Sequence, residues 1–560
     1  MLARPIWALR MLVWWLRDLP RRARRPPERV AFLLEAPPPE PDQPRPPRWQ
    51  RLLGLARPPV SIQALARQLR TVTAEPRVRT VVLHVRPMDL APSVVDALRE
   101  LVAEVRTADV RVVCWAPSYT ASTYLVACAA DEVLLQPGGL LAPLGLAREH
   151  VFLAEALGRV GLRADILQVS PYKTAGDPLT RRGLTPEARE MSEWLADAAF
   201  EARLAAVAAG RGLDEAAARA LVDATPLVDD QALAAGAVDA VVTEEELPGR
   251  LGGEIRPWGS AMRRLPRPRP QPPGRVVALL RIEGLIVDGR SRGAPFRLPM
   301  APPILFSEQS GDLTVVEQAR ALALDRRVGA VVVWVDSGGG SATASESMAS
   351  ALSALGRRKP VVAAMGSVAA SGGYYVTAAA ARVFAHPGTI TGSIGVLAGK
   401  LVAGGLLDRL LIGREQVVRG EHSAMWSAEA PFTDGERRKM GELVDRSYRL
   451  FLERVAAARS RPVAEIEPVA GGRVWTGGQA LGHGLVDELG GLEAAVAAAR
   501  RLGGLPAGAP VRQVRRGRRE LVPVPAAAPA AALEHALRAV AALRQAGVWW
   551  LCPLVSEDGG

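Results

Sequence analysis

The sequence is poor in cysteine, lysine, histidine and aromatic residues, and each shortage narrows what the chain can be. Three cysteines in 560 residues, none of them in a CxxC pair, support neither a disulfide framework nor a zinc site. The sequence contains no HExxH motif and no GxxxxGK[ST] loop, so metal-dependent hydrolysis and phosphate-loop nucleotide binding are not expected. We therefore predict no metal and no other cofactor.

Long apolar runs are also missing. Residues 5–19 contain three tryptophans among aliphatic residues, but Arg10 interrupts this run and Arg17 ends it, short of the roughly 20 residues that cross a bilayer. Spacings of seven and four place Arg10, Arg17 and Arg21 on one helical stripe. We predict an amphipathic helix at a membrane surface, with a helix docked on its own protein as the alternative. Because no small-residue cleavage site follows, a removable signal peptide is not expected.

The net charge of +12 is not arranged for nucleic acid. Almost all basic residues are arginines that are scattered or lie in proline-rich segments, and no basic stripe alternates with aromatic residues. We expect no nucleic-acid partner and some attraction to anionic lipid. A hydrophobic fraction of 49% and a length of 560 residues predict a folded protein of two or more domains.

What the sequence does contain is one order of strands and helices that occurs twice. Buried strand-like runs alternate with helical patterns, which predicts a parallel sheet with crossover helices. About 250 residues later the same order returns. The matched segments are Val81–Val85 with Val331–Val335, Arg111–Val113 with Pro360–Val362, Ala130–Gly138 with Ala380–Gly388, and Gln231–Asp239 with Gln479–Asp487. Four ordered matches at about one offset predict an α/β protein made by tandem duplication of one domain.

Proline-rich and arginine-rich stretches divide the chain into five predicted parts. These are an amphipathic segment at residues 1–27, a first repeat at 28–255, a Pro/Arg linker at 256–275, a second repeat at 276–505, and a basic, Ala-rich tail at 506–560. The tail contains a predicted helix that carries Leu533, Leu537, Val540 and Leu543. It ends in Val548–Leu551, which we expect to be a second surface anchor or a segment packed on the body.

Ser371 lies in a stretch of small residues, Met365–Tyr375, that predicts a turn opening a helix. Such a turn leaves the hydroxyl accessible and backbone N–H groups free to face a developing oxyanion, so Ser371 is a candidate nucleophile. A packing turn is the alternative. The first copy reads Ala121-Ser122-Thr123-Tyr124 opposite Ala370–Gly373, and it has also lost the glycines of the turn at 336–340.

Lys173 lies in the first copy, within Ser170–Thr174, and the second copy has His422 and Ser423 at that point. One copy thus keeps a serine with glycine turns and the other keeps a lysine, which predicts one composite site with Ser371 as nucleophile and Lys173 as base. A lysine acts as a base at neutral pH only when its pKa is lowered, which burial achieves. The alternatives are an ordinary surface lysine and His422 as the base. The lysines of the chain are Lys173, Lys359, Lys400 and Lys439.

These motifs resemble the signal peptide peptidase A family in its long, two-domain form, serine proteases with a ClpP/crotonase-like fold. The resemblance covers about residues 28–505. It rests on Ala369–Tyr374 as the nucleophile motif, Thr391–Val396 as a second signature, Tyr172–Ala175 with Asp177-Pro178 as the lysine motif, and Gly471–Gly477 as a late turn.

The resemblance implies a role for each site residue. Ser371 would be the nucleophile, Lys173 the general base, and Ser393 the residue that orients the lysine amine. The oxyanion donors would be the backbone N–H of Gly372 and one from Gly339 or Gly340. The family usually has proline where this chain has Gly338, so we expect a more flexible oxyanion loop.

The resemblance also implies substrates, assembly and location. We expect cleavage of short hydrophobic peptides such as released signal peptides, in a homo-oligomer that is tetrameric by resemblance, at the bacterial inner membrane. Association would be peripheral or through the N-terminal segment, on either side, with the cytoplasm as the alternative location. Two alternative functions are a crotonase-like acyl-CoA enzyme and a catalytically inactive membrane-associated scaffold.

Overall fold

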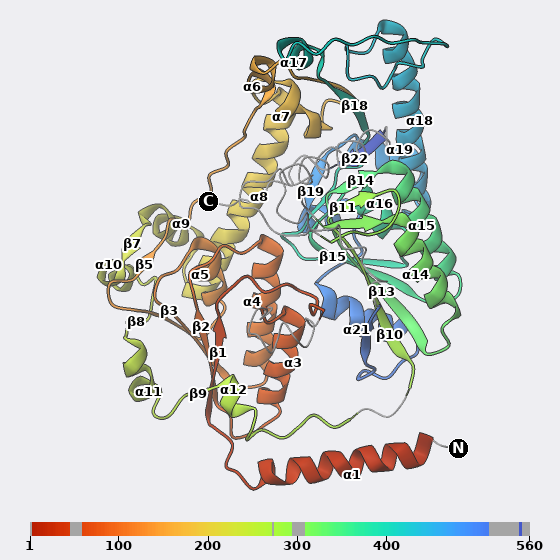
Figure 1. Cartoon of the computed structure of the whole chain (residues 1–560). Coiled ribbons are helices and arrows are strands. Elements are labelled where there is room, and N and C mark those ends of the chain that lie inside the picture. The colour runs from red at the N-terminus through yellow and green to blue at the C-terminus, as the bar shows by residue number, and fades with distance from the viewer. Residues whose placement is uncertain (1–2, 45–58, 271–273, 294–307, 515–547, 552–560) are drawn as a thin grey trace. The chain divides into compact units, whose positions relative to one another are not determined.

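The computed structural model describes residues 3–44, 59–270, 274–293, 308–514 and 548–551. The chain forms two compact units (Figure 1). The first comprises Met1–Ala147 with Ala196–Gly274, and the second comprises Arg148–Leu195 with Arg275–Gly560. Helix α8, Pro186–Arg211, contributes residues to both units. These compact units are defined by contacts in the structure, whereas the predicted repeats are defined by sequence. The units therefore do not test the predicted domain boundaries, which stay a prediction.

A six-stranded parallel sheet forms the centre of the first unit, in the order β8-β4-β3-β2-β1-β9. Successive apolar residues of its strands point to opposite faces of the sheet, as the pleat of a strand requires. Val81 and Leu83 contribute to the core under α3 and α4, whereas Val82 packs with Leu247 of α11 on the other face. The strands are β1 Arg29–Leu34, β2 Thr80–Val85, β3 Arg111–Ala116, β4 Glu132–Leu135, β8 Ala240–Val241 and β9 Arg256–Pro257.

Helices cover this sheet. Ser61 accepts a hydrogen bond from Ala64 N–H and so caps α3. The helices are α3 Ile62–Thr73, α4 Pro92–Thr107, α5 Ala121–Ala127, α9 Glu215–Ala224, α10 Asp229–Ala234, α11 Leu247–Arg250 and α12 Trp258–Ala261, and a small hairpin is made by β5 Leu140–Leu141 and β7 Leu227–Val228.

Helix α1, Ala3–Arg22, has two distinct faces. One face docks on residues of the same unit, since the Trp14 indole donates to Pro268 O and Asp18 accepts from Arg267 N–H. The opposite face is exposed and apolar, with exposed fractions of 40–61%. It carries Leu9, Leu12, Leu16 and Leu19. The amphipathic helix is confirmed as a helix, and in the described part of the chain no helix is both long and apolar enough to cross a membrane.

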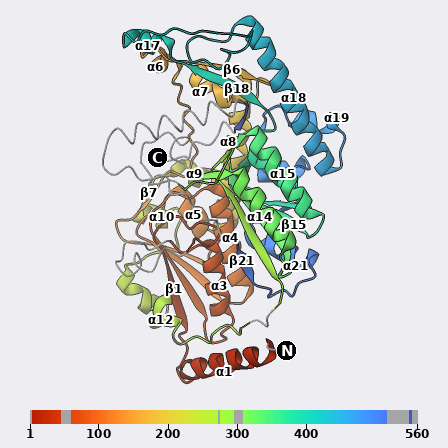
Figure 2. The ribbon, with the colours of Figure 1, turned by 45° about the vertical axis from the view of Figure 1, so that its right-hand side comes forward.

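The second unit contains a larger, mainly parallel sheet, ordered β19-β17-β15-β13-β10-β21, with β16 beside β15 and β20 beside β16. Its central strands are buried on both faces, as is typical of parallel sheets. Successive residues of β10 enter separate cores: Ala278 and Leu280 pack with α14 and α15, while Val277 and Leu279 pack with α21. Figure 2 labels these three helices. The strands are β10 Val276–Glu283, β13 Val328–Ser337, β15 Val361–Ala370, β16 Arg382–Ala385, β17 Ile390–Gly392, β19 Val474–Thr476, β20 Glu488–Leu489 and β21 Val511–Gln513.

A second sheet of this unit has the order β12-β11-β14-β22-β18-β6. Its strands are β6 Arg163–Gln168, β11 Leu285–Val287, β12 Gln309–Gly311, β14 Gly339–Ser341, β18 Leu397–Val402 and β22 Val548–Leu551. The helices of the unit are α6 Ala154–Arg159, α7 Asp177–Thr180, α14 Asp312–Leu324, α15 Ala342–Gly356, α16 Gly372–Ala378, α17 Gly404–Arg409, α18 Asp434–Arg459, α19 Val463–Ile466, α20 Gly477–Gly482 and α21 Leu492–Leu502. Short 3-10 helices occur in this unit at Thr174–Gly176 and Glu467–Val469, and in the first unit at Glu244–Glu246.

The duplication is visible in the strand order. The path β8-β4-β3-β2-β1-β9 in the first unit has its counterpart in β20-β16-β15-β13-β10-β21 in the second. Each strand of the first path precedes its counterpart by roughly 250 residues. The predicted α/β tandem duplication is confirmed.

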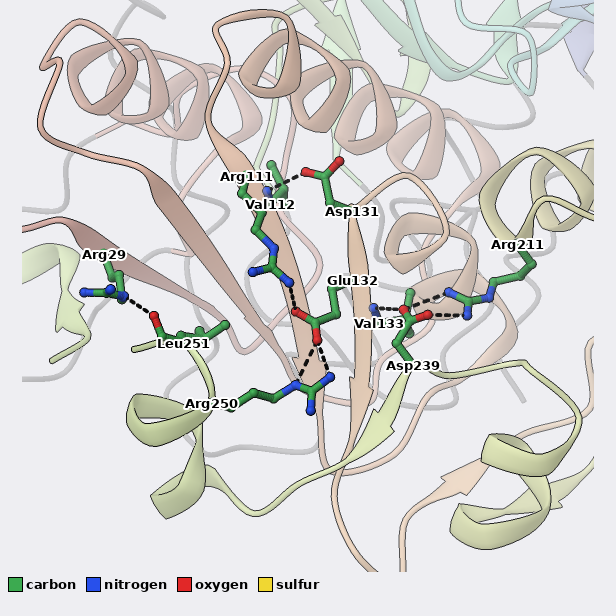
Figure 3. A network of polar contacts seen from close by, with 10 residues as sticks. All are labelled: Arg29, Arg111, Val112, Asp131, Glu132, Val133, Arg211, Asp239, Arg250 and Leu251. Atoms are coloured by element: carbon green, nitrogen blue, oxygen red, sulfur yellow. Dashed lines mark hydrogen bonds and ion pairs between the residues drawn. The ribbon is translucent and has the colours of Figure 1, made fainter. Parts of the chain in front are cut away.

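Polar contacts at the starts of the strands repeat as well. In the first unit the Asp239 carboxylate accepts from Val133 N–H at 2.7 Å and from the Arg211 guanidinium at 2.7 and 3.0 Å (Figure 3). Close by, Glu132 accepts from Arg250 at 2.6 and 2.8 Å. Burial opposes ionisation of Asp239, but the bonds from Arg211 and Val133 leave its pKa below the ordinary value.

The second unit has the same arrangement. Asp487 accepts from Val383 N–H at 2.7 Å and from Arg459 at 3.0 Å. Likewise the Tyr124 hydroxyl donates to a backbone carbonyl 113 residues later, and the Tyr374 hydroxyl to one 111 residues later. These buried contacts survive in both copies because each one satisfies a backbone group that water cannot reach.

Each sheet has an edge strand that lies outside the residues of the predicted repeat. Residues 256–257, expected in the linker, form β9 and pair with β1, and Trp258 stacks on Phe32 at 5.4 Å. In the second repeat β21 adds to the same edge, beyond residue 505. Strands of two or three residues at a sheet edge tolerate proline and lack a readable alternation, which is why a composition-based boundary misses them. The predicted tail helix with Leu533 lies outside the described residues.

Candidate active site

Ser371 occupies the junction between β15 and α16. Its backbone has φ of 55° and ψ of −117°, a conformation that costs a non-glycine residue on the order of 1–3 kcal/mol. Its N–H donates to Gly392 O at 2.8 Å and its carbonyl accepts from Tyr375 N–H at 2.9 Å. The side chain is fully buried. A strained strand-to-helix turn of this kind presents a single hydroxyl at the edge of a sheet.

Ser393 is brought beside Ser371 by strand register. Strands β15 and β17 are parallel and pair Ala370 with Gly392, so the residues that follow each partner lie next to each other. Ser393 also has a positive φ, 51°, and its N–H donates to Arg473 O at 2.6 Å. The 22 residues between Ser371 and Ser393 therefore correspond to the register of two neighbouring strands.

The Lys173 amine lies between the two serines. Its Nζ atom is 2.8 Å from Ser371 Oγ, 3.0 Å from Ser393 Oγ and 3.0 Å from Ser393 O. All three residues are 0% exposed. The two hydroxyls can donate as well as accept, so the three contacts fit an ammonium that donates to all three oxygens or a neutral amine that accepts from one hydroxyl.

The segment that carries Lys173 belongs to the second unit and is attached there by sheet pairing. Strand β6 pairs antiparallel with β18 over six residues, and Val169 N–H then donates to Val396 O at 3.0 Å. The backbone at Gly472 and Gly395 also lies close to Lys173. A Cβ atom placed on Gly472 would lie 2.6 Å from Lys173 N and Cα, and one on Gly395 would lie 3.2 Å from Lys173 Cδ. Only glycine fits at Gly472, which also has φ of 90°.

Aromatic side chains pack behind this segment. Trp194 of α8 stacks on Trp475 at 4.9 Å and on Tyr172 at 6.1 Å, and the Arg473 guanidinium lies 3.9 Å from the centre of the Tyr172 ring. The Tyr172 hydroxyl donates to Glu190 at 2.6 Å, which raises the pKa of that tyrosine. The stack connects the lysine segment to the late turn that starts at Gly471.

The backbone at Gly372 lies against the glycine turn of β14. A Cβ atom at Gly372 would be 3.2 Å from Gly339 Cα, 3.3 Å from Gly340 N and 2.6 Å from Ser345 Oγ. Gly339 and Gly340 have φ of 107° and 152°, values that side chains rarely permit. Gly339 N–H donates to Ser337 Oγ at 3.1 Å. The turn therefore places backbone next to the first residue of α16, where an oxyanion formed at Ser371 would need donors.

The other candidate bases lie elsewhere in the described structure. The His422 ring makes no hydrogen bond to Ser371 among the described contacts, and Lys439 forms an exposed ion pair with Glu442 at 2.7 Å. Lys359 donates to two carbonyls at the end of α14. Lys400 donates to Met425 O, and burial lowers its pKa. Lys173 is the basic group that meets the Ser371 hydroxyl.

In the first copy, the sequence comparison pairs Ser371 with Ser122, a residue of α5. The Ser122 hydroxyl accepts from Leu90 N–H at 3.0 Å. This bond holds the loop that replaced the glycine turn.

The family model for peptidase family S49 matches residues 104–252 and 353–505, more than half of the chain. The chain belongs to peptidase family S49. Similar S49 relatives include a serine protease SPPA, chloroplastic, of Arabidopsis thaliana, 28% identical over 469 residues, which are 80% of this chain and 66% of that protein. Protease 4 of Haemophilus influenzae is 27% identical over 76% of this chain and 71% of its own length, and Protease 4 of Salmonella typhi is 29% identical over 69% and 62%.

This S49 chain thus spans about two thirds of the length of these relatives. By family it is classed with the serine proteases. The S49 model matches one segment in each repeat, which agrees with the tandem duplication.

The sequence predicted the residues that meet at the site but not the residues that pack around them and fix their positions. Gly395 and Gly472 flank the Lys173 side chain, and Trp194 with Trp475 supports its segment. Both glycines lie within motifs on which the family resemblance rests, so the sequence could have identified them. Nothing in the sequence around Trp194 could have identified its role, because its partner Trp475 is 281 residues away.

Proposed function

We propose that this chain is a serine endopeptidase that cleaves short hydrophobic peptides through an acyl-enzyme on Ser371. Lys173 acts as general base and Ser393 orients its amine. The observation that carries the proposal is the 2.8 Å approach of Lys173 Nζ to Ser371 Oγ in a site where both residues are 0% exposed. Nucleophile and base within hydrogen-bond reach is the geometry that this chemistry requires.

The proposed reaction proceeds in two halves. The neutral Lys173 amine takes the Ser371 proton as Oγ attacks the peptide carbonyl, and the oxyanion faces backbone N–H groups of Gly372 and of Gly339 or Gly340. The lysine ammonium then gives its proton to the leaving amine, and the acyl-enzyme remains. Lys173 next takes a proton from water, whose oxygen attacks the ester, and the acid product leaves as Ser371 regains its proton.

Burial supports a lysine in the base role. A buried amine loses hydration of its charged form, which favours the unprotonated amine that the proposal needs. In that form the amine donates to Ser393 and accepts from the Ser371 hydroxyl. Arginine would not substitute, because a guanidinium stays protonated at neutral pH.

The test combines covalent labelling with turnover. A fluorophosphonate probe should label the wild-type chain at Ser371, and Ser371→Ala should abolish labelling. Lys173→Ala and Lys173→Arg should each lower the labelling rate and kcat/KM on a fluorogenic apolar peptide by at least about a hundred-fold. Lys439→Ala and Ser350→Ala, at exposed ion-pair and hydrogen-bond positions, serve as matched controls and should leave both rates unchanged.

Each outcome separates the candidate functions. Near-normal turnover in Lys173→Ala would remove the dyad. Turnover of acyl-CoA esters without labelling of Ser371 would favour a crotonase-like enzyme, and a folded chain with neither labelling nor turnover would be a scaffold.

The partners proposed for this chain include a second copy of itself. Helix α17 lies against α6 in the second unit, with the Arg409 guanidinium bonded to Arg159 O (Figures 1 and 2). The segments around these helices expose large apolar side chains, of which Leu411 is 92% exposed. The others are Val151, Leu153, Val160, Leu401, Leu410, Ile412, Val417 and Val418. So many exposed apolar side chains on neighbouring segments are typical of a protein interface, which supports a homo-oligomer.

A further inference from the structure

A strand from the far end of the chain lies inside the second sheet of the second unit. Strand β22 pairs antiparallel with β14, where Gly339 faces Leu551 and Ser341 faces Trp549. On its other side β22 pairs antiparallel with β18, where Leu397 faces Trp549. Strands β14 and β18 are therefore joined through four residues of the C-terminal region.

Both neighbours of β22 belong to the proposed active site. Strand β14 carries the glycine turn proposed to hold the oxyanion, and β18 begins four residues after Ser393. Strand β22 also lies against α15 and against α16, which starts directly after Ser371. The register places Leu551 opposite Gly339. The backbone of the tail thus runs where a peptide must run to reach Ser371.

An extended peptide bound between two strands uses their backbone groups for affinity, whatever its sequence. The same backbone groups of β14 and β18 cannot pair with β22 and with a peptide substrate at once. Residues 548–551 read Val-Trp-Trp-Leu, which is the apolar class of sequence proposed for the substrates. Being part of the same chain, this segment is present at an effective concentration of the order of millimolar.

We propose that residues 548–551 occupy the peptide-binding groove of this enzyme as an extended apolar peptide, in competition with substrate. The inference rests on the proposed function and deepens it. A substrate enters between β14 and β18 as an antiparallel strand, and the residue before its scissile bond takes the place of Leu551 opposite Gly339. The tail lowers the apparent affinity for other peptides.

Two truncated chains test this competition. A chain that ends at Gly547 lacks β22, and a control chain that ends at Cys552 keeps it. On a fluorogenic apolar peptide, the chain ending at Gly547 should show a KM lower by about ten-fold or more with kcat unchanged, because an intramolecular competitor has been removed. The control should match the full chain. Equal KM values in all three chains would overturn the proposal.

A direct binding measurement keeps the inference separate from the proposed function. A fluorescein-labelled peptide of residues 545–551 should bind the chain ending at Gly547, measured by anisotropy, and bind the full chain at least about ten-fold more weakly. Equal affinities, or no binding to the truncated chain, would contradict the inference. Absence of turnover and of Ser371 labelling in every chain would instead contradict the proposed function, and the anisotropy result would still decide about the groove.

A full-length variant covers the case in which truncation prevents folding. Trp550→Pro removes one backbone N–H from the strand and restricts its φ, so it should weaken the pairing with β14. It should lower KM as the truncation does. A KM unchanged by Trp550→Pro, together with an unchanged affinity for the labelled peptide, would overturn the proposal.

Discussion

Ser371 and Ser393 have positive φ angles, and each is preceded by a strand residue whose pairing holds it there. The φ values of 55° and 51° direct both side chains toward the amine of Lys173. Such strain persists only where the surroundings enforce it. Here the register of β15 and β17 does so, since it fixes the two residues before them. The site is therefore preorganised by the sheet rather than by a flexible loop.

The first prediction concerns Ser393 as a positioning residue. Ser393→Ala removes one of the hydrogen bonds to the Lys173 amine, worth roughly 1–2 kcal/mol, so kcat should fall about ten-fold or somewhat more while KM stays the same. The rate of fluorophosphonate labelling at Ser371 should fall in parallel. Steady-state kinetics and labelling rates measure both.

Thr389→Val provides the matched control for this loss of a buried hydroxyl. The Thr389 side chain is fully buried and donates to Gly366 O at 2.9 Å, without contact to the amine. Its replacement should lower stability and leave kcat near the wild-type value. A drop in kcat of the same size in both variants would mean that Ser393 acts on stability alone.

At the scale of elements, the turn between β13 and β14 is where we propose that the oxyanion is held. The Gly339 and Gly340 conformations exclude side chains, and a Cβ atom on Gly340 would collide with Ile286 O. Gly338 is different, because it is absent from the described glycines with positive φ. Its backbone therefore does not need glycine for a left-handed conformation, and the residue adds freedom to the unfolded chain and to the turn.

The second prediction follows from this difference. Gly338→Pro should raise the free energy of unfolding by about 0.4–1 kcal/mol, because proline reduces the conformational freedom of the unfolded chain. The preceding Ser337 ends β13 in an extended conformation, which a following proline favours. We also expect kcat/KM to rise a few-fold as the oxyanion turn becomes more rigid. Denaturant unfolding and peptide turnover measure the two effects, and a stabilised variant with reduced kcat/KM would show that the turn needs its freedom.

Much of this site could be predicted at the scale of elements, for a physical reason. Buried parallel strands such as β2 and β13 are continuous apolar runs, and the residues after β15 and β17 carry the chemistry, so motif spacing reports register. The sequence did not predict very short strands or pairings between distant segments. Strands β9 and β21 are too short to read, and the pairing of β22 with β14 joins residues about 210 apart with no local pattern.

The whole molecule reflects a duplication in which only the second copy has the glycine turn beside Ser371. The contacts of Asp239 and Asp487 stayed in both copies because they satisfy buried backbone groups, whereas the glycine turn at 336–340 has no glycine opposite it, at residues 86–90. The sequence comparison between copies could detect which residues were lost. It could not show that residues 148–195 of the first copy pack within the second unit, since that is a property of contacts.

The last prediction concerns α1 and its exposed face. Leu9, Leu12, Leu16 and Leu19 are available to a bilayer surface because the face with Trp14 and Asp18 is already docked. The full chain should bind vesicles that contain anionic lipid, less strongly at high salt, because the apolar face inserts and the neighbouring arginines attract the headgroups. Leu12→Glu with Leu16→Glu should weaken binding by about ten-fold or more, since each leucine loses its contribution of about 1.5–3 kcal/mol on burial.

Vesicle co-sedimentation measures this binding, and a second pair of leucines supplies the control. Leu313 and Leu324 of α14 are 55% and 72% exposed, so Leu313→Glu with Leu324→Glu makes the same change in side-chain chemistry outside α1. This control should bind vesicles as the wild-type chain does. Equal losses in the two double variants would mean that net charge governs binding, and strong binding by the α1 variant would assign the membrane surface to another part of the chain.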